Sequence, residues 1–450
     1  KRKKKEKKEK KREKKRKKEK TIEEERSKEK KKEERKREKG KKEREREKDS
    51  GRAALARPPA FTHEQPENRD EMALVLTEEQ QLLRDTATQF FQERLPIANL
   101  RKLRDTRDAT GFDQAAWKEM ADLGFAGIMI SEKYGGTDFG PVGLGLVLEQ
   151  AGRTLAASPL VSTVLLCGSA VQLAGNATQR QEILSAIAAG DRIMALALEE
   201  GPHHNPTRIA TRAEADGSSY RISGTKTFVL DGHVAEQLIV VARTSGNDND
   251  RTGLTLFLVD PKAAGVKITR TLMVDGRNAA NIELDNVRAP ASSVLGSVDG
   301  GNDVVEQVLD IARIGLSAEM LGMVQQTFDT TLDYLKERKQ FGKVIGSFQA
   351  LQHRMAVLFS EIELCRSVVL DALSALEERR NDVPLIASLA KSRLSDVATL
   401  MTNEGLQMHG GMGMTDQFDV GLFMKRARVA SASFGDGNFH RDRYATLEGY

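Results

Sequence analysis

The spacing of apolar residues changes twice along the chain, and this limits the folds that are open to it. From residue 74 to about 189, apolar side chains recur at helical intervals, as in LTEEQQLLRDTATQFFQERL and AAWKEMADLGFAGIMI. From about 190 to 302 the apolar runs are short, rich in β-branched residues and bounded by Gly, Asp and Asn, as in EQLIVVARTS and GLTLFLVD. From 303 to 450 the helical spacing returns in long stretches.

This order predicts an α+β multidomain chain. We expect an N-terminal helical domain over residues 74–189, a small central β-domain of barrel or sandwich type over 190–302, and a C-terminal four-helix bundle over 303–450. Thr77 is expected to cap the first helix, because a threonine hydroxyl can accept from a free N–H and two glutamates follow it.

Residues 1–52 form a charged low-complexity tail that cannot bury a core. The first 50 residues hold 30 Lys/Arg and 15 Asp/Glu, with Ile22 as their only large apolar residue. Such a segment is either disordered or an exposed helix held by Glu–Lys pairs. Two interpretations of this tail are open. In the first, its basic side chains contact nucleic acid or an anionic surface. In the second, which we expect, it is a solvated appendage or an artefact of the gene start. Residues 53–73 have the Pro-rich, polar composition of a linker.

The cysteine and histidine content excludes several classes of site. The only two cysteines, Cys167 and Cys365, lie in apolar segments that are predicted to be helical. Two such cysteines do not form a disulfide framework, and this favours a reducing compartment. The seven histidines show no spacing typical of metal ligands, so no metal site is expected. No run of eighteen apolar residues predicts a membrane span.

Five strings in the body, taken together, resemble the acyl-CoA dehydrogenase family. In chain order they are GFAGIMISEKYGGTDFG, ISGTKTFVLDG, LDNVRAPASSVLG, YLKERKQFGKVIGSFQALQH and GLQMHGGMGM. The resemblance covers residues 74–450 and agrees with the helical, β, helical order. It implies an FAD-dependent oxidoreductase that acts on the CH–CH group of an acyl-CoA thioester.

The resemblance assigns FAD contacts to two strings of the bundle. Arg338 offers a charged planar fork suited to pyrophosphate, and Phe341 offers a flat face for a ring. In the family these positions reach the FAD of a neighbouring subunit, which makes oligomerisation part of cofactor binding. The alternative for Arg338 is a solvated cation at a helix end, and the alternative for Gly410 and Gly411 is an ordinary turn. The implied set is Arg338, Phe341, Gln349, Gln407, Gly410 and Gly411.

The β-block supplies the subunit's own flavin contacts, and here the sequence departs from the family. Phe228 stands where the family has a tryptophan beside the flavin ring and is expected to line that ring. Glu199 and Leu230 each stand where the family has a threonine. Leu230 cannot form a hydrogen bond to the flavin, and the Glu199 carboxylate would lie near a flavin that is anionic when reduced. We therefore expect the chain to bind FAD, but more weakly than is usual in the family.

Substrate contact is implied for Asp310 and Arg313, which match an Asp and an Arg on the family's first long bundle helix. Three residues apart, they share one helix face. The alternative is a surface ion pair.

The catalytic base is the open question. The family abstracts the Cα proton with the Glu of Tyr-Glu-Gly-Thr, seven residues before an Arg. When the motif is aligned without a gap, its Glu falls on Phe434 and its Arg on Arg441, and no base remains. When the alignment is shifted by two residues, Asp436 takes the place of the Glu and Arg443 that of the Arg. Both alignments keep the seven-residue spacing, so the spacing cannot decide between them. Asp436 is the candidate base, although a turn-forming Asp between two glycines is the alternative.

Three functions remain open on this sequence. The leading expectation is FAD-dependent α,β-dehydrogenation of an acyl-CoA with Asp436 as the base and electron-transfer flavoprotein as the acceptor. The second is a catalytically incomplete subunit of a heteromeric dehydrogenase; the expected assembly is a homotetramer or dimer, or such a heteromer. The third is binding of nucleic acid or an anionic surface through the tail. The expected compartment is the bacterial cytoplasm, or the mitochondrial matrix of a eukaryote.

Overall fold

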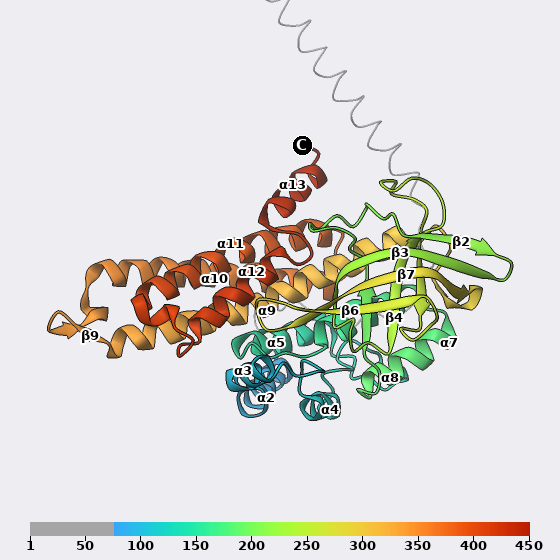
Figure 1. Ribbon diagram of the computed structural model, residues 1–450. Coiled ribbons are helices and arrows are strands. Elements are labelled where there is room, and N and C mark those ends of the chain that lie inside the picture. The colour runs from blue at the N-terminus through green and yellow to red at the C-terminus, as the bar shows by residue number, and fades with distance from the viewer. Residues whose placement is uncertain (1–75) are drawn as a thin grey trace, which may run out of the picture. The chain divides into compact units, whose positions relative to one another are not determined.

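The computed structural model describes residues 76–450, which hold a helical part, a sheet part and a second helical part in chain order (Figure 1). This order confirms the predicted fold class. The charged tail predicted over residues 1–52 and the linker over 53–73 lie outside the described residues.

The first part consists of short helices and two π-helical segments. Thr77 caps the first helix as predicted: its hydroxyl accepts from the Gln80 N–H at 3.2 Å, and the Gln80 side chain accepts from the Thr77 N–H. The elements are α2 (Glu78–Arg94), α3 (Ile97–Thr106), α4 (Gln114–Asp122), α5 (Gly140–Arg153), the π-helical η2 (Leu160–Gly168), α6 (Ser169–Ala174), α7 (Ala177–Gln179), the π-helical η3 (Arg180–Leu184) and α8 (Ser185–Ala188).

The second part is one mixed sheet with the strand order β6-β7-β3-β2-β4-β5-β8, in which β1 pairs parallel to β4. Its longest strands, β3 and β7, pair antiparallel along most of their length with two register shifts. The burial of β7 alternates over most of the strand, as expected for a half-covered sheet. The strands are β1 (Met194–Ala197), β2 (Arg212–Asp216), β3 (Ser219–Leu230), β4 (Gln237–Arg243), β5 (Leu254–Val259), β6 (Val266–Leu272), β7 (Asn278–Pro290) and β8 (Val294–Leu295).

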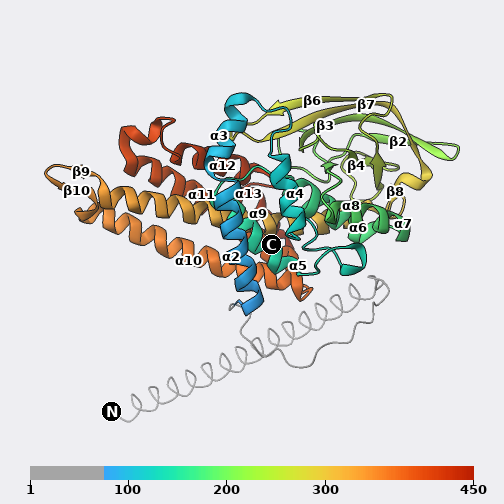
Figure 2. The same ribbon diagram turned by 90° about the horizontal axis from the view of Figure 1, so that it is seen from below.

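The third part is the predicted bundle of long helices. Its first two helices are joined by a short hairpin, β9 (Lys339–Gln340) and β10 (Lys343–Val344). Figure 1 and Figure 2 both place this hairpin at the end of the bundle that lies farthest from the sheet. The helices are α9 (Gly301–Glu337), α10 (Gln349–Glu377), α11 (Val383–His409), α12 (Val420–Ala432) and α13 (Gly437–Leu447).

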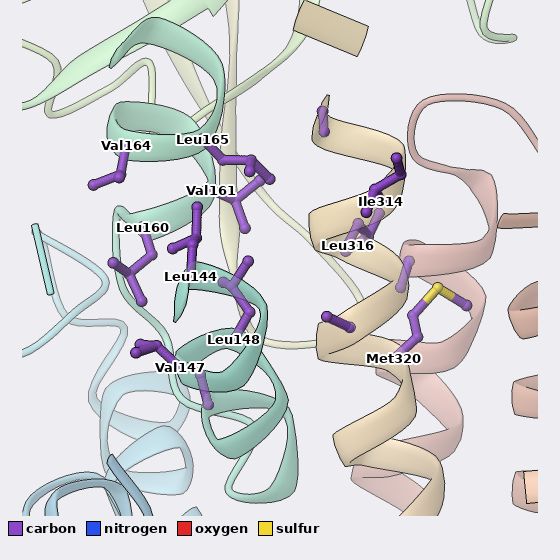
Figure 3. Close-up of a cluster of buried hydrophobic side chains, with 14 of the residues drawn as sticks. Leu144, Val147, Leu148, Leu160, Val161, Val164, Leu165, Ile314, Leu316 and Met320 are labelled. Atoms are coloured by element: carbon purple, nitrogen blue, oxygen red, sulfur yellow. The ribbon is translucent and has the colours of Figure 1, made fainter. Parts of the chain in front are cut away.

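The core joins the two helical parts through α5, η2 and α9. Figure 3 shows Leu148, Val161 and Leu165 of α5 and η2 directed toward α9, whereas Met320 of α9 points to the other side of that helix. All four side chains belong to one buried cluster. Helices α5 and α9 approach so closely that a Cβ on Gly322 would lie 1.7 Å from the Glu149 carbonyl oxygen. Only glycine fits at this crossing, which fixes the distance between the two helices.

Both cysteines are free and buried, Cys167 in η2 and Cys365 in α10. Burial raises the pKa of the Cys365 thiol to about 12, so neither thiol is reactive near neutral pH. Within residues 76–450 no helix is both long and apolar enough to cross a membrane.

Candidate active site

A cavity of about 440 Å³, here called the main cavity, opens between the sheet and the end of α12. Its walls come from the segment after β1, the end of β3, the end of β6 and residues 428–434. A side cavity of about 30 Å³ adjoins it and shares Leu230, Met273, Ser433 and Phe434 with it. The main cavity can hold a ring system or a chain, whereas the side cavity holds only a small group.

Two phenylalanines with strained backbones face the main cavity. Phe228 at the end of β3 has φ 51°, and Phe434 after α12 has φ 59°. A bulky residue rarely adopts positive φ, and such strain concentrates at functional sites. Phe228 also keeps 54% of its surface exposed. The structure places Phe228 on the wall of the main cavity, and its contact with a flavin ring stays a prediction.

Buried donors hold the loop that carries Phe434. The carbonyl oxygen of Phe434 accepts from His440 Nε2 at 3.0 Å and from Arg313 Nε at 3.3 Å. Lys391 Nζ donates to the carbonyl oxygens of Gly435 at 2.9 Å and Ser431 at 3.0 Å. Burial lowers the pKa of Lys391 to about 7. These contacts keep the strained backbone of Phe434 in place.

Asp436 lies beyond that loop and lines neither cavity. It is exposed and caps α13, where its Oδ1 accepts from the Phe439 N–H at 2.8 Å. An aspartate is among the best residues for this position because its oxygen satisfies a free helix N–H. In this structure the predicted base is thus a helix cap, whereas Ser433 and Phe434 of the same loop line both cavities.

Asp310 and Arg313 of α9 form a buried ion pair rather than a surface one. Arg313 Nη1 donates to Asp310 Oδ1 at 2.8 Å, and both side chains are almost fully buried. Arg313 Nη2 lies 3.2 Å from Nε2 of His204, which lines the main cavity. The predicted pair therefore lies behind the cavity wall, where Arg313 contacts two residues that line the cavity, His204 and Phe434.

His204 joins this pair to Glu199. Its Nδ1 contacts Glu199 Oε1, and its Nε2 faces a guanidinium that can only donate. Nε2 therefore accepts from Arg313, and Nδ1 faces the carboxyl group of Glu199. The other oxygen of this carboxyl group accepts from the Asn205 N–H. The sequence did not predict this arrangement.

A buried pair also fixes the segment that carries Glu199. Lys226 of β3 is fully buried, and its Nζ donates to Glu200 Oε1 at 2.7 Å and to the Leu198 carbonyl oxygen at 3.2 Å. The wall of the main cavity is thereby attached to the sheet.

The six predicted FAD contacts of the bundle lie together, away from both cavities. Tyr334 near the end of α9 stacks on His409 at the end of α11 with 4.2 Å between ring centroids, which brings the two strings to one end of the bundle. Phe341 is 89% exposed there, and a Cβ on Gly410 or Gly411 would meet nothing within 4 Å. All six are exposed: Arg338, Phe341, Gln349, Gln407, Gly410 and Gly411.

Sequence reasoning missed a buried charge cluster beside the side cavity. Arg426 donates to Asp275 at 2.9 Å and to Glu319 at 3.1 Å, and Arg277 donates to Glu319 at 2.8 Å. Asp231 lines the same cavity. One signal was present: Glu319 is the only charged residue between Arg313 and Asp329, in an otherwise helical apolar stretch. Among residues 76–450, no cluster of potential metal ligands is found.

Known proteins match each part of this architecture. Family models described as the acyl-CoA dehydrogenase N-terminal, middle and C-terminal domains match residues 77–191, 196–287 and 299–446. The chain is 31% identical over 380 residues to "Probable acyl-CoA dehydrogenase YngJ" of Bacillus subtilis, covering 82% of this chain and 98% of that protein. The chain belongs to the acyl-CoA dehydrogenase family.

Two further relatives of this family are informative about assembly. A structure of the Tcur3481-Tcur3483 steroid ACAD is 31% identical with a TM-score of 0.74, and covers 82% of this chain and 98% of that one. The "Caffeyl-CoA reductase-Etf complex subunit CarC" of Acetobacterium woodii is 28% identical and covers 79% of this chain and 94% of that protein.

Acyl-CoA dehydrogenases are FAD-dependent flavoproteins, and the main cavity fits such a ring system. Three large apolar side chains on its walls are more than half exposed and lie around one cavity, where a flat apolar group could cover them: Phe228, Leu272 and Val274. Phe228 would stack beside the ring, and the residues at the end of β6 would cover its apolar edge. The protein is an oxidoreductase that acts on acyl-CoA.

Proposed function

We propose that this chain takes part in α,β-dehydrogenation of an acyl-CoA thioester as the base-free subunit of a heteromeric acyl-CoA dehydrogenase. The observation that carries this proposal is the position of Phe434, which faces both cavities two residues before the N-cap Asp436. In the family motif Tyr-Glu-Gly-Thr, the threonine is the residue of a type that caps helix N-termini. When this threonine is aligned with the N-cap residue Asp436, the glutamate of the motif is aligned with Phe434.

The chain's own residues then perform the binding steps. FAD, when bound, supplies the acceptor for the hydride that leaves Cβ. Phe228, Leu230 and Phe434 exclude water from the cavity. The two carboxylates that line the cavities, Glu199 and Asp231, do not stand at the position of the family's glutamate, which is Phe434 here. The Cα proton and the Cβ hydride therefore leave together at the site of a second subunit, whose own glutamate is the base.

The exposed end of the bundle supports a contribution to that second site. Arg338 presents a charged fork, Phe341 a flat exposed ring, and Gly410 and Gly411 an open backbone. We propose that these side chains contact the FAD of the partner subunit. The two-part name of the steroid ACAD and the complex-subunit name of the caffeyl-CoA relative are in keeping with such an assembly. Electron-transfer flavoprotein is the proposed acceptor, and a reducing compartment suits two free thiols.

A visible spectrum tests the proposal. The full chain would be purified alone and together with a family member that carries Tyr-Glu-Gly-Thr, and a panel of acyl-CoA thioesters would be added. We expect flavin bleaching only in the presence of the second subunit, and equal bleaching with Asp436→Asn in this chain. Bleaching by the chain alone that Asp436→Asn abolishes would instead establish Asp436 as the base of a self-sufficient dehydrogenase.

A further inference from the structure

A half-buried carboxylate, that of Asp231, lines the side cavity. Asp231 directly follows β3, and its Oδ2 accepts from the Ser162 hydroxyl of η2 at 2.6 Å. This hydroxyl is the only hydrogen-bond donor to the Asp231 side chain among residues 76–450. A carboxylate has room for about four such bonds. Asp231 can therefore accept further donors from a group in the cavity.

The charges around the side cavity do not balance. Arg277 and Arg426 are engaged by Glu319 and Asp275, and within the described residues Asp231 forms no ion pair of its own. The set holds three carboxylates and two guanidiniums, so Asp231 is the unmatched acid. A buried unmatched carboxylate is costly unless donors reach it. Burial accordingly raises the pKa of Asp231, to about 6.

The lining of the side cavity is mixed. Arg277 and Arg426 line it beside Asp231, four apolar side chains contribute as well, and the space measures about 30 Å³; the apolar residues are Val161, Met273, Leu316 and Phe434. That volume holds a group of one or two heavy atoms. Because four residues line both cavities, a chain in the main cavity can extend its tip into the side cavity.

We propose that the side cavity receives the far end of the acyl group, and that Asp231 selects acyl groups whose far end carries a hydroxyl or another hydrogen-bond donor. The donor fills the free positions of the carboxylate and offsets the cost of its burial. A methyl end leaves Asp231 unmatched, and a carboxylate end adds a second negative charge. This specificity rests on the proposed function for the class of ligand, an acyl-CoA, and adds that such a ligand enters this chain's own cavity.

Coenzyme A thioethers test the assignment without turnover, because they lack the acidic Cα proton of a thioester. S-(ω-hydroxyalkyl)-CoA and the S-alkyl-CoA in which a methyl replaces the hydroxyl would be titrated calorimetrically into the full flavin-loaded protein, with chains of three to eight carbons. At the best chain length we expect the hydroxyl compound to bind on the order of tenfold tighter, as for a hydrogen bond to a charged group. An S-(ω-carboxyalkyl)-CoA of the same length should bind more weakly than either.

Asp231→Asn is the deciding variant, because asparagine keeps the shape and tolerates the φ of 53° at this position. It should reduce the hydroxyl preference to less than about threefold. Ser162→Ala is the matched control, since it removes the neighbouring hydroxyl and keeps the carboxylate, and it should retain the preference. Equal binding of the hydroxyl and methyl compounds, or a preference that survives Asp231→Asn, would overturn the assignment. Failure of every thioether to bind would overturn this inference alone, because the proposed function places the reaction at the second subunit's own site.

Discussion

The Oδ1 of Asp436 accepts a hydrogen bond from the backbone N–H of Phe439 at 2.8 Å, so this carboxylate starts α13. We expect Asp436→Ala to lower the free energy of unfolding by about 1 kcal/mol, the usual effect of losing a cap. Asp436→Thr should preserve stability because threonine also caps helices. Urea denaturation followed by circular dichroism measures both, and equal stability of Asp436→Ala and the wild type would contradict the capping role.

Phe434→Glu should install a base in the cavity. The buried donors His440 and Arg313 hold the backbone of residue 434, so a glutamate there would project where Phe434 does. A positioned base contributes roughly 100-fold or more to proton transfer. We expect at least that gain in deuterium exchange at Cα of an acyl-CoA in D₂O, measured by mass spectrometry. Phe434→Gln is the control of equal shape, and an exchange rate no higher than in this control would count against the assignment of position 434.

Glu199→Thr should raise the reduction potential of the bound flavin. The Glu199 carboxylate lines the main cavity, and a negative charge there disfavours an anionic reduced ring. Each ~1.4 kcal/mol of relief corresponds to roughly 30 mV for a two-electron couple. Dye-equilibrium titration measures the potential, and Glu199→Gln should raise it in the same direction. A potential that is unchanged in both variants would show that the carboxylate, turned toward His204, is screened from the ring.

Asp231 should make stability depend on pH in the acid range. Its pKa is raised from 3.8 to about 6, chiefly by burial, against smaller opposing effects of Ser162, Arg277 and Arg426. Between about pH 4 and 6 the folded state therefore binds more protons than the unfolded state, and stability falls as pH rises through this window. The loss amounts to roughly 3 kcal/mol, at about 1.4 kcal/mol per pKa unit.

The Asp231→Asn variant lacks this titration. It should match the wild type near pH 4 and exceed it in stability near pH 7, as measured by urea unfolding at both values. A difference between variant and wild type that does not change with pH would mean that Asp231 keeps an ordinary pKa in the fold.

Local patterns of the sequence were sufficient to predict most of the architecture. The β-branched runs ISGTKTFVL, LIVVAR and TLFLV became β3, β4 and β5 because their spacing and glycine boundaries leave little choice. The Thr77 cap was predictable for the same reason, since the interaction spans only three residues.

The site was less predictable because its contacts join residues far apart in the chain. Phe434 and Asp436 stand in equivalent registers, each seven residues before an arginine, and only the start of α13 distinguishes them. Glu199 and Arg313 are linked through His204, and no spacing indicates that contact. Likewise, a strand-end aspartate such as Asp231 looks like an ordinary turn residue until η2 covers it.

The burial of both thiols makes the chain well suited to spectroscopic labelling. Cys167 and Cys365 are the only cysteines of the sequence and are inert in the fold, so no native residue has to be removed first. A Phe341→Cys substitution would then offer the single reactive thiol, at the tip of the bundle. A spin label or fluorophore attached there would report distances between subunits directly, in mixtures of this chain with itself or with another family member.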